Sequence, residues 1–365
     1  MSISEGKKNI LEADINFDIG GVSTMQKALF AKHLALMLRS GIPISEALSI
    51  ASSSSRGKMA AVLEKIRKSV ESGRSLSAAF ADFPGVFSDL FINVARIGEA
   101  SGTLPENLEG ISEQLKKERE LISKIKTAMM YPVMVLSAAF VLGMVVSFAI
   151  LPKITPLFEG LDIELPITTR ILIAFSKIVQ QNGIYLFVGI VLSVALGLWL
   201  IRRKFMHPVT HWVMLNTPIV KNISKSSNLA RFSRTLGTLL KSGVPIDEAL
   251  DIARSSAGNY YYKKALVKVS VNTKKGVKLW KNLSQFESLF PPLLIRMIRV
   301  GEKSGNFEET LFYLADYYEQ EVDNSTKTIS TAIEPAMLLG IGLVVGFLAL
   351  SIITPIYNIT GNIGR

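Results

Sequence analysis

The sequence predicts an all-α, polytopic membrane protein with three transmembrane helices and two tandem helical-bundle domains on the cytoplasmic side. Three observations support this prediction. Three long stretches carry no charge, Lys and Arg are concentrated in two polar segments, and two motifs recur about two hundred residues apart. Of the 365 residues, 48% are hydrophobic and 19% are charged, and the mean hydropathy is positive. That balance suits a membrane protein better than a soluble one.

The three charge-free stretches are VMVLSAAFVLGMVVSFAIL, IYLFVGIVLSVALGLWLI and AMLLGIGLVVGFLALSIIT. A helix of nineteen residues measures about 28 Å, close to the ~30 Å hydrocarbon core of a bilayer. The alternative, a buried core helix of a soluble protein, rarely produces three such runs in one chain. We therefore predict transmembrane helices at 132–151, 184–201 and 335–355.

The distribution of Lys and Arg predicts the orientation of these helices. Residues 1–132 carry 17 of them, residues 203–335 carry 19 and residues 152–183 carry three. Basic residues stay on the cytoplasmic side, so 152–183 is predicted to be a short external loop and 356–365 an external tail. The net charge of +11 then largely reflects topology. Nucleic-acid binding would require a basic patch with interleaved aromatic residues, and the sequence contains none, so no nucleic acid is expected as a partner. The expected environment is the lipid bilayer.

The first repeated motif is RSGIPISEALSIA at 39–51, which returns as KSGVPIDEALDIA at 241–253. In each copy a glycine is predicted to end one helix in the left-handed conformation. A proline then opens the next helix, and a glutamate lies in its first turn, where the helix dipole favours negative charge. These residues are Gly41, Pro43 and Glu46 in the first copy and Gly243, Pro245 and Glu248 in the second.

The second repeated motif is RIGEASGTLPENL from Arg96, answered by RVGEKSGNFEETL from Arg299 at an offset of 203 residues. Each copy is predicted to be a helix-to-helix turn, with capping-box spacing at Thr103–Glu106 and a near equivalent at Asn306–Glu309. The remaining motif residues are Gly98, Glu99 and Gly102 in the first copy and Gly301, Glu302 and Gly305 in the second.

The glutamates of this second motif have two possible roles. We expect the carboxylates of Glu99 and Glu302 to hold the turns, bonded to backbone N–H groups or to the nearby Arg96 and Arg299. The alternative is direct contact with a partner protein. Replacement by glutamine distinguishes the two roles, because it keeps most of the shape and removes the charge.

The repeat continues into the membrane and explains the middle span. Pro132 and Pro152 bracket the first span as Pro335 and Pro355 bracket the third, all at the same offset of 203 residues. Two tandem copies in one orientation can be joined only if the chain returns to the cytoplasm, and helix 184–201 provides that return. The predicted domains are 24–130 and 202–334, preceded by a loosely ordered segment, 1–23.

Glu334 is the point where the two copies diverge most in chemistry. MYP precedes the first span and IEP the third, so Tyr131 is replaced by a carboxylate next to Pro335. A charge near hydrocarbon usually has a partner. We expect Glu334 to pair with a basic group of this chain or of a neighbouring subunit, where movement of the domain reaches the third span. The alternative is that Glu334 is solvated among lipid headgroups.

The paired motifs, the duplicated domain and the three spans resemble the type II secretion F family over roughly residues 24–357. These are inner-membrane platform proteins of type IV pilus and type II secretion machines. The resemblance implies a non-enzymatic scaffold in the bacterial inner membrane, with a cytoplasmic N-terminus and a periplasmic C-terminus. It implies as partners a hexameric secretion ATPase, pilin or pseudopilin subunits, other inner-membrane assembly proteins, and a second copy of the chain in a homo-oligomer, with a dimer favoured. The short N-terminal region favours a pilus system, and type II secretion stays the alternative.

The sequence contains no pattern typical of a catalytic, cofactor or metal site, as is expected of a scaffold. The sequence has no phosphate-binding G-x-x-x-x-G-K-[ST] loop, no G-x-S-x-G motif and no cysteine. His207 and His211 could share a helix face, but no third metal ligand is in view. The alternative function, a membrane transporter or channel, lacks the ionisable groups within the spans that ion-coupled transport usually needs.

Overall fold

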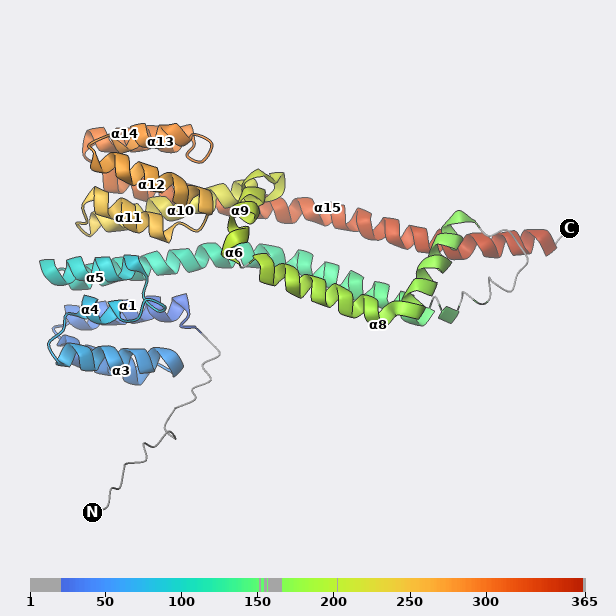
Figure 1. The fold of residues 1–365 in the computed structure, drawn as a ribbon, viewed down its shortest axis with the longest axis horizontal. Coiled ribbons are helices and arrows are strands. Elements are labelled where there is room, and N and C mark those ends of the chain that lie inside the picture. The colour runs from blue at the N-terminus through green and yellow to red at the C-terminus, as the bar shows by residue number, and fades with distance from the viewer. Residues whose placement is uncertain (1–20, 151, 154–155, 157–165, 202, 364–365) are drawn as a thin grey trace, which may run out of the picture. The chain divides into compact units, whose positions relative to one another are not determined.

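The computed structural model describes residues 21–150, 152–153, 156, 166–201 and 203–363, which form helices and connecting turns with no strand among them (Figure 1). The chain divides into two compact units. Unit 1 comprises residues 1–119 and 235–256, and unit 2 comprises residues 120–234 and 257–365. The boundaries fall inside two long helices, α6 (Leu104–Val145) and α10 (Pro218–Lys241), so each of these helices contributes to both units.

Unit 1 is a helical bundle built around aromatic side chains. Phe30, Phe80, Phe87 and Phe91 are all buried, and the ring centroids of Phe80 and Phe87 are 4.5 Å apart. Burial of such rings contributes most of the hydrophobic stabilisation of a small core. The helices of unit 1 are α1 (Thr24–Arg39), α2 (Ile44–Ser54), α3 (Gly57–Glu71), α4 (Leu76–Ala81), α5 (Asp89–Ser101), α11 (Ile246–Ser256), the first part of α6 and the last part of α10.

The first motif forms the predicted helix ends. Gly41 has φ 84°, and the N–H of Ile42 donates to the carbonyl of Met37 at 3.1 Å. Gly243 has φ 86°, with the equivalent bond from Val244 to Leu239 at 3.0 Å. Only a residue without Cβ takes this left-handed conformation at low cost, so a glycine ends both helices.

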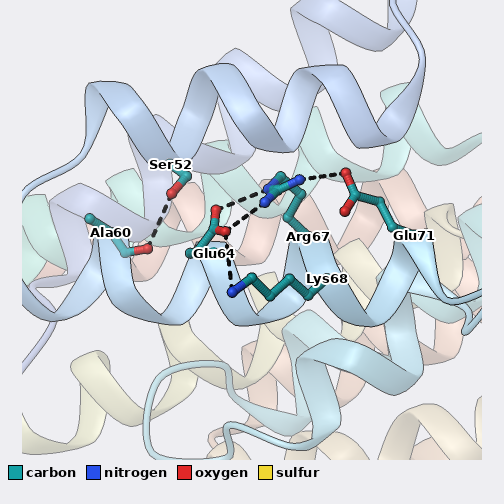
Figure 2. Close-up of polar contacts among 6 residues, drawn as sticks. All are labelled: Ser52, Ala60, Glu64, Arg67, Lys68 and Glu71. Carbon is teal, nitrogen blue, oxygen red and sulfur yellow. Dashed lines mark hydrogen bonds and ion pairs between the residues drawn. The ribbon is translucent and has the colours of Figure 1, made fainter.

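The pair of helices α2 and α3 is held together by polar contacts at its surface as well as by its core. Figure 2 shows the Oγ of Ser52 donating to the carbonyl of Ala60 at 3.3 Å, which joins the two helices. On α3, Arg67 lies between two carboxylates and donates through Nε to Glu64 at 2.9 Å and through Nη1 to Glu71 at 2.5 Å. Opposite charges at this spacing lie on one face of a helix and support it modestly.

Unit 2 also has an aromatic core. The ring of Phe290 packs against those of Phe232 and Tyr262 at centroid distances of 5.7 and 5.4 Å, and the hydroxyl of Tyr262 donates to the carbonyl of Leu289 at 2.7 Å. The remaining helical elements, all in unit 2, are η1 (Val146–Ile150), α8 (Ile167–Ile201), η2 (Lys204–Met206), α9 (His207–Asn216), α12 (Tyr260–Lys274), α13 (Leu279–Leu283), η3 (Ser284–Phe286), α14 (Pro292–Ser304) and α15 (Phe307–Ile363), together with the other parts of α6 and α10.

The helices follow the sequence repeat. α11 begins 202 residues after α2, and α14 begins 203 residues after α5. The longest helices also correspond, because α6 begins at Leu104 and α15 at Phe307. The compact units do not follow the repeat, since α11 and the end of α10 lie in unit 1 with the helices of the first copy.

Two helices are long and apolar enough to cross a membrane, Leu104–Ile150 (α6 with η1) and Phe307–Thr354 (within α15). A third candidate is the bent pair Ile167–Gly183 and Tyr185–Ile201, whose two halves meet at 80°. The described part of the chain therefore holds two membrane-type helices, or three if the bent pair is one span. Pro132 and Pro335, the prolines predicted to begin the first and third spans, lie inside continuous helices, α6 and α15.

The segment predicted as an external loop differs in part from the structure. Residues 167–183 are helical, and the buried residues Thr169, Leu172, Ser176 and Val179 fall on one face of that helix. The Oγ1 of Thr169 donates to the carbonyl of Ser351 in α15 at 2.8 Å, which joins the helix to α15. This helix is not part of a charge-free run, because it contains Arg170 and Lys177, and its buried face includes hydroxyl side chains.

Candidate functional site

The second motif forms a turn between two packed helices in both copies. In the first copy α5 ends at Gly102 with φ 74° and α6 follows. In the second copy α14 ends at Gly305 with φ 76° and α15 follows. Each turn therefore directs the chain into one of the long helices that continue toward the membrane-type segments, which makes it a candidate site for transmitting movement.

The other glycine of the motif allows the two helices to approach closely. A Cβ added to Gly98 would lie 2.8 Å from the Cα of Leu104 and 2.9 Å from Nδ2 of Asn107. A Cβ added to Gly301 would lie 2.7 Å from Oγ1 of Thr310. Real Cβ atoms do not approach other atoms this closely, so only glycine fits between the packed helices at both positions.

Glu99 joins α5 to the N-terminus of α4. Its Oε1 accepts from the N–H of Leu76 at 2.7 Å, and its Oε2 accepts from the N–H of Ser77 at 3.1 Å and from the Oγ of Ser77 at 2.8 Å. Backbone donors at a helix N-terminus otherwise lack partners inside the helix, and a carboxylate satisfies them well. Glu99 therefore bonds to backbone N–H groups, one of the two kinds of partner expected for it, and these belong to α4.

Glu302 has the equivalent position in the second copy and a different environment. Its Oε2 is buried and has no hydrogen-bond partner in the described part of the chain. Trp280 stands where the first copy has Ser77, and its Nε1 is likewise buried without a partner among the described residues. A buried polar atom without a partner costs about 1–3 kcal/mol. The second copy therefore lacks the arrangement that holds the first.

The two arginines of the motif also differ. Arg96 donates to the carboxylate of Glu248 on α11 and to Oδ1 of Asn93, the latter at 2.7 Å. The guanidinium of Arg299 instead lies over the ring of Trp280, 4.7 Å from its centroid. The ion pair between Arg96 and Glu248 brings the two repeated motifs together inside unit 1.

The predicted capping residues make local contacts. The hydroxyls of Thr103 and Ser101 lie 2.7 Å apart, and Nδ2 of Asn306 donates to the carboxylate of Glu309. A full capping box is present at Ser23 and Gln26, where each side chain bonds the other residue's backbone N–H.

Glu334 is exposed on α15 beside Pro335. No ion pair of its carboxylate is present among the described residues, so the expected basic partner is not supplied by that part of the chain. About two to three turns earlier on α15, Asp323 bonds Lys327 at 2.8 Å and lies 3.6 Å from Lys124 of α6. The hydrogen bond from Lys327 lowers the pKa of the Asp323 carboxyl, and the positive charge of Lys124 contributes in the same direction.

The histidines form a structural contact. The rings of His207 and His211 are 5.3 Å apart, and Nδ1 of His211 accepts from the N–H of Tyr260 at the start of α12, at 2.9 Å. Burial lowers the pKa of His211, and repulsion from His207 lowers it further. Within the described residues no cluster of three His, Cys, Asp or Glu side chains is arranged to hold a metal ion.

The chain matches the model of the family described as type II secretion system protein F twice, over residues 30–152 and 232–355. It is 34% identical over 340 residues to a type IV pilus assembly protein PilC of Thermus thermophilus, covering 92% of this chain and 83% of the relative. A PilC protein of Pseudomonas aeruginosa is 31% identical over 349 residues, 94% of this chain and 92% of the relative.

A type II secretion system protein F of Vibrio cholerae is 30% identical over 348 residues, with coverage of 94% and 85%. The two family matches contain both copies of both repeated motifs and extend into the membrane-type helices. The chain therefore belongs to the type II secretion system protein F family.

Proposed function

We propose that this chain is the inner-membrane platform of a type IV pilus assembly machine, which couples a cytoplasmic assembly ATPase to the extraction and assembly of pilin subunits. The observation that carries the proposal is the double family match, together with similarity over nearly the whole chain to proteins named for type IV pilus assembly. The sequence has no phosphate-binding loop, so ATP hydrolysis is assigned to the partner and the chain itself is not an enzyme.

The platform is proposed to consist of two tandem cytoplasmic domains, 24–130 and 202–334, and three transmembrane helices. The distribution of Lys and Arg supports a cytoplasmic N-terminus and a periplasmic C-terminus, with the bent pair of α8 as the return span. Reporter fusions after residues 126, 164, 281 and 365 are expected to lie inside, outside, inside and outside. A cytoplasmic signal at position 164 contradicts this topology.

Coupling is proposed to pass through the second motif. Each turn lies at the start of a single long helix, α6 or α15, and helices transmit displacement along their axes because their backbone bonds resist stretching. The second copy is the better candidate for the moving part, since Glu302 and Trp280 keep unpartnered buried atoms there among the described residues. A motor that presses on this turn would act directly on α15.

The partners are tested by affinity purification of the full-length chain from membranes in mild detergent. Co-purification of an assembly ATPase and of pilins is the expected result. The alternative within the family is a type II secretion platform, favoured by the similarity to the Vibrio cholerae protein. Co-purification of pseudopilins and loss of protein secretion on deletion, with pili unaffected, would support that alternative instead.

A further inference from the structure

The two copies of the repeat contact each other inside unit 1 through two different surfaces, one from each copy. Helix α5 of the first copy lies against α11 of the second, where Arg96 forms an ion pair with Glu248. Beside this pair, Cγ2 of Ile97 lies 4.0 Å from the position of a Cβ on Gly243. Because the domain is repeated, each of these two surfaces has an equivalent elsewhere in the chain: α2 corresponds to α11, and α14 corresponds to α5.

The surface of α2 is uncovered where that of α11 is covered. Ile252 on α11 is 5% exposed, whereas Ile50, the equivalent residue on α2, is 41% exposed. Glu46, the equivalent of Glu248, is exposed and takes part in no ion pair or hydrogen bond within the described residues. The first copy thus presents an apolar residue and a free carboxylate in the arrangement that the second copy uses to bind α5.

The surface of α14 shows the complementary difference. Leu90 on α5 is 5% exposed and Ile97 is half-buried, whereas their equivalents on α14, Leu293 and Val300, are 40% and 57% exposed. Leu293 and Val300 are seven residues apart and therefore lie on one face of the helix. Arg299 is exposed next to them, with its guanidinium over the ring of Trp280.

We propose that α14 of one chain binds α2 of a second copy of the same chain, through an interface equivalent to the one between α5 and α11. Arg299 of one chain pairs with Glu46 of the next, and Val300 lies beside Gly41, as Ile97 lies beside Gly243. The apolar face of α14 that includes Leu293 covers Ile50. We assign the partner as a second copy because the chain already contains this interface between equivalent surfaces. In both cases an arginine lies on one helix, α5 or α14, and a glutamate on the other, α11 or α2. The proposal concerns assembly of the platform and holds independently of which machine the platform serves.

The contact is heterologous, because two different surfaces meet. Repetition of a heterologous contact gives a closed ring or an open array. Chains that share one membrane orientation are related by rotation about the membrane normal, which favours closure of the ring. Within such a ring every α2 and α14 surface is covered, so the domains form a continuous cycle of equivalent contacts.

The test uses cross-linking, for which the natural chain is well suited because it has no cysteine. Glu46→Cys and Arg299→Cys are introduced into separate full-length chains with different tags, co-expressed in membranes and treated with a short bismaleimide. A covalent product that carries both tags is expected. Absence of this product, or an equal yield when Val267→Cys on α12 replaces Arg299→Cys, overturns the proposal. A product between two Glu46→Cys chains also overturns it, since that requires an isologous contact.

Two further variants separate the interface from folding. Arg96→Cys with Glu248→Cys in one chain is the matched control, expected to give an intrachain cross-link by the same reagent. In the full-length chain, Arg299→Glu is expected to reduce severalfold the yield of oligomer captured by chemical cross-linking. Adding Glu46→Arg to the same chain is expected to restore that yield. The proposed ion pair is contradicted if the oligomer yield stays low in the charge-reversed double variant while its melting temperature is unchanged.

Discussion

Ser77 donates two hydrogen bonds to one oxygen of Glu99, from its N–H at 3.1 Å and from its Oγ at 2.8 Å. The carboxylate therefore closes the N-terminus of α4 from a neighbouring helix, and it fixes α5 where the turn into α6 begins. In the second copy Trp280 replaces Ser77 and cannot supply the hydroxyl, and Glu302 keeps a buried oxygen without a partner among the described residues.

The two glutamates are expected to respond differently to removal of the charge. Glu99→Gln replaces one accepting oxygen by an NH₂ group that faces backbone donors, so we expect a loss of about 1–2 kcal/mol in the free energy of unfolding. Glu302→Gln is expected to leave that free energy unchanged or to raise it. Thermal unfolding of the purified full-length variants measures both, and equal losses would contradict the difference between the copies. If Glu302→Gln keeps stability and protein level but abolishes assembly, Glu302 contacts the motor.

The close approach of the helices at Gly98 predicts that two glycine-to-alanine substitutions change the free energy of unfolding in opposite directions. Gly98→Ala places a methyl group within 3 Å of Leu104 and Asn107, and overpacking of this kind costs about 1–3 kcal/mol. Gly110→Ala is the matched control within α6, because a Cβ there meets nothing within 4 Å. It is expected to stabilise the helix by up to about 1 kcal/mol. Chemical unfolding measures both changes, and equal signs would rule out the proposed packing role of Gly98.

Arg234 stabilises the second copy in a way that the first copy does not use. Its side chain is 9% exposed and donates to Glu319 at 2.7 Å and to Asp316. Burial lowers the pKa of Arg234, but the hydrogen bonds to Glu319 and Asp316 outweigh burial and raise it. Removing one partner of such a pair leaves a charge poorly solvated, so Arg234→Ala is expected to cost about 3 kcal/mol.

Lys32 is the matched control for Arg234, since it occupies the equivalent position in the first copy and is exposed. Lys32→Ala is expected to change stability by less than about 0.5 kcal/mol. Melting temperatures of the two variants, measured side by side in the same detergent, provide the comparison. A similar small shift for both would show that the ion pairs of Arg234 contribute little.

His211 predicts a dependence of stability on pH. Burial and the charge of His207 lower the pKa of His211 in the folded protein, so the unfolded chain binds the proton more readily. The stabilisation is therefore fully present above the ordinary histidine pKa of about 6.5 and is lost as the pH falls below it. Protonation also removes the acceptor of the Tyr260 N–H.

The measurement for His211 is the melting temperature between about pH 7.5 and pH 5. The natural chain is expected to lose stability toward acid more steeply than His211→Asn, whose Oδ1 can accept the same bond without titrating. His207→Asn serves as the control for the neighbouring ring and is expected to keep most of the slope. An unchanged slope in His211→Asn would assign the acid sensitivity to other groups.

Local chemistry made the helix ends predictable. The left-handed conformation at Gly41 and Gly243 was predictable from the Ser-Gly-x-Pro pattern, because glycine adopts a positive φ at low cost and proline has a fixed φ suited to the start of the next helix. The bonding of Glu99 to backbone N–H groups was one of two expected arrangements, but its partners could not be identified because Leu76 and Ser77 lie 22–23 residues away.

Contacts between distant segments could not be predicted from the sequence. The pair of Arg96 and Glu248 joins residues 152 positions apart in two different copies, and no periodicity predicts such a partner. The helix at 167–183 was missed because hydroxyl side chains, Thr169 and Ser176, form part of its buried face. The burial of Arg234 was missed for a similar reason, since a charged residue on an amphipathic helix is usually exposed.

The central claim is that this chain is required as the platform for pilus assembly. The most direct measurement is deletion of its gene, followed by counting of surface filaments by electron microscopy, with immunoblots of pilin and of the assembly ATPase. The account predicts that filaments disappear while both proteins remain at normal levels, and that the natural chain supplied in trans restores the filaments. Normal filaments in the deletion strain would contradict the account.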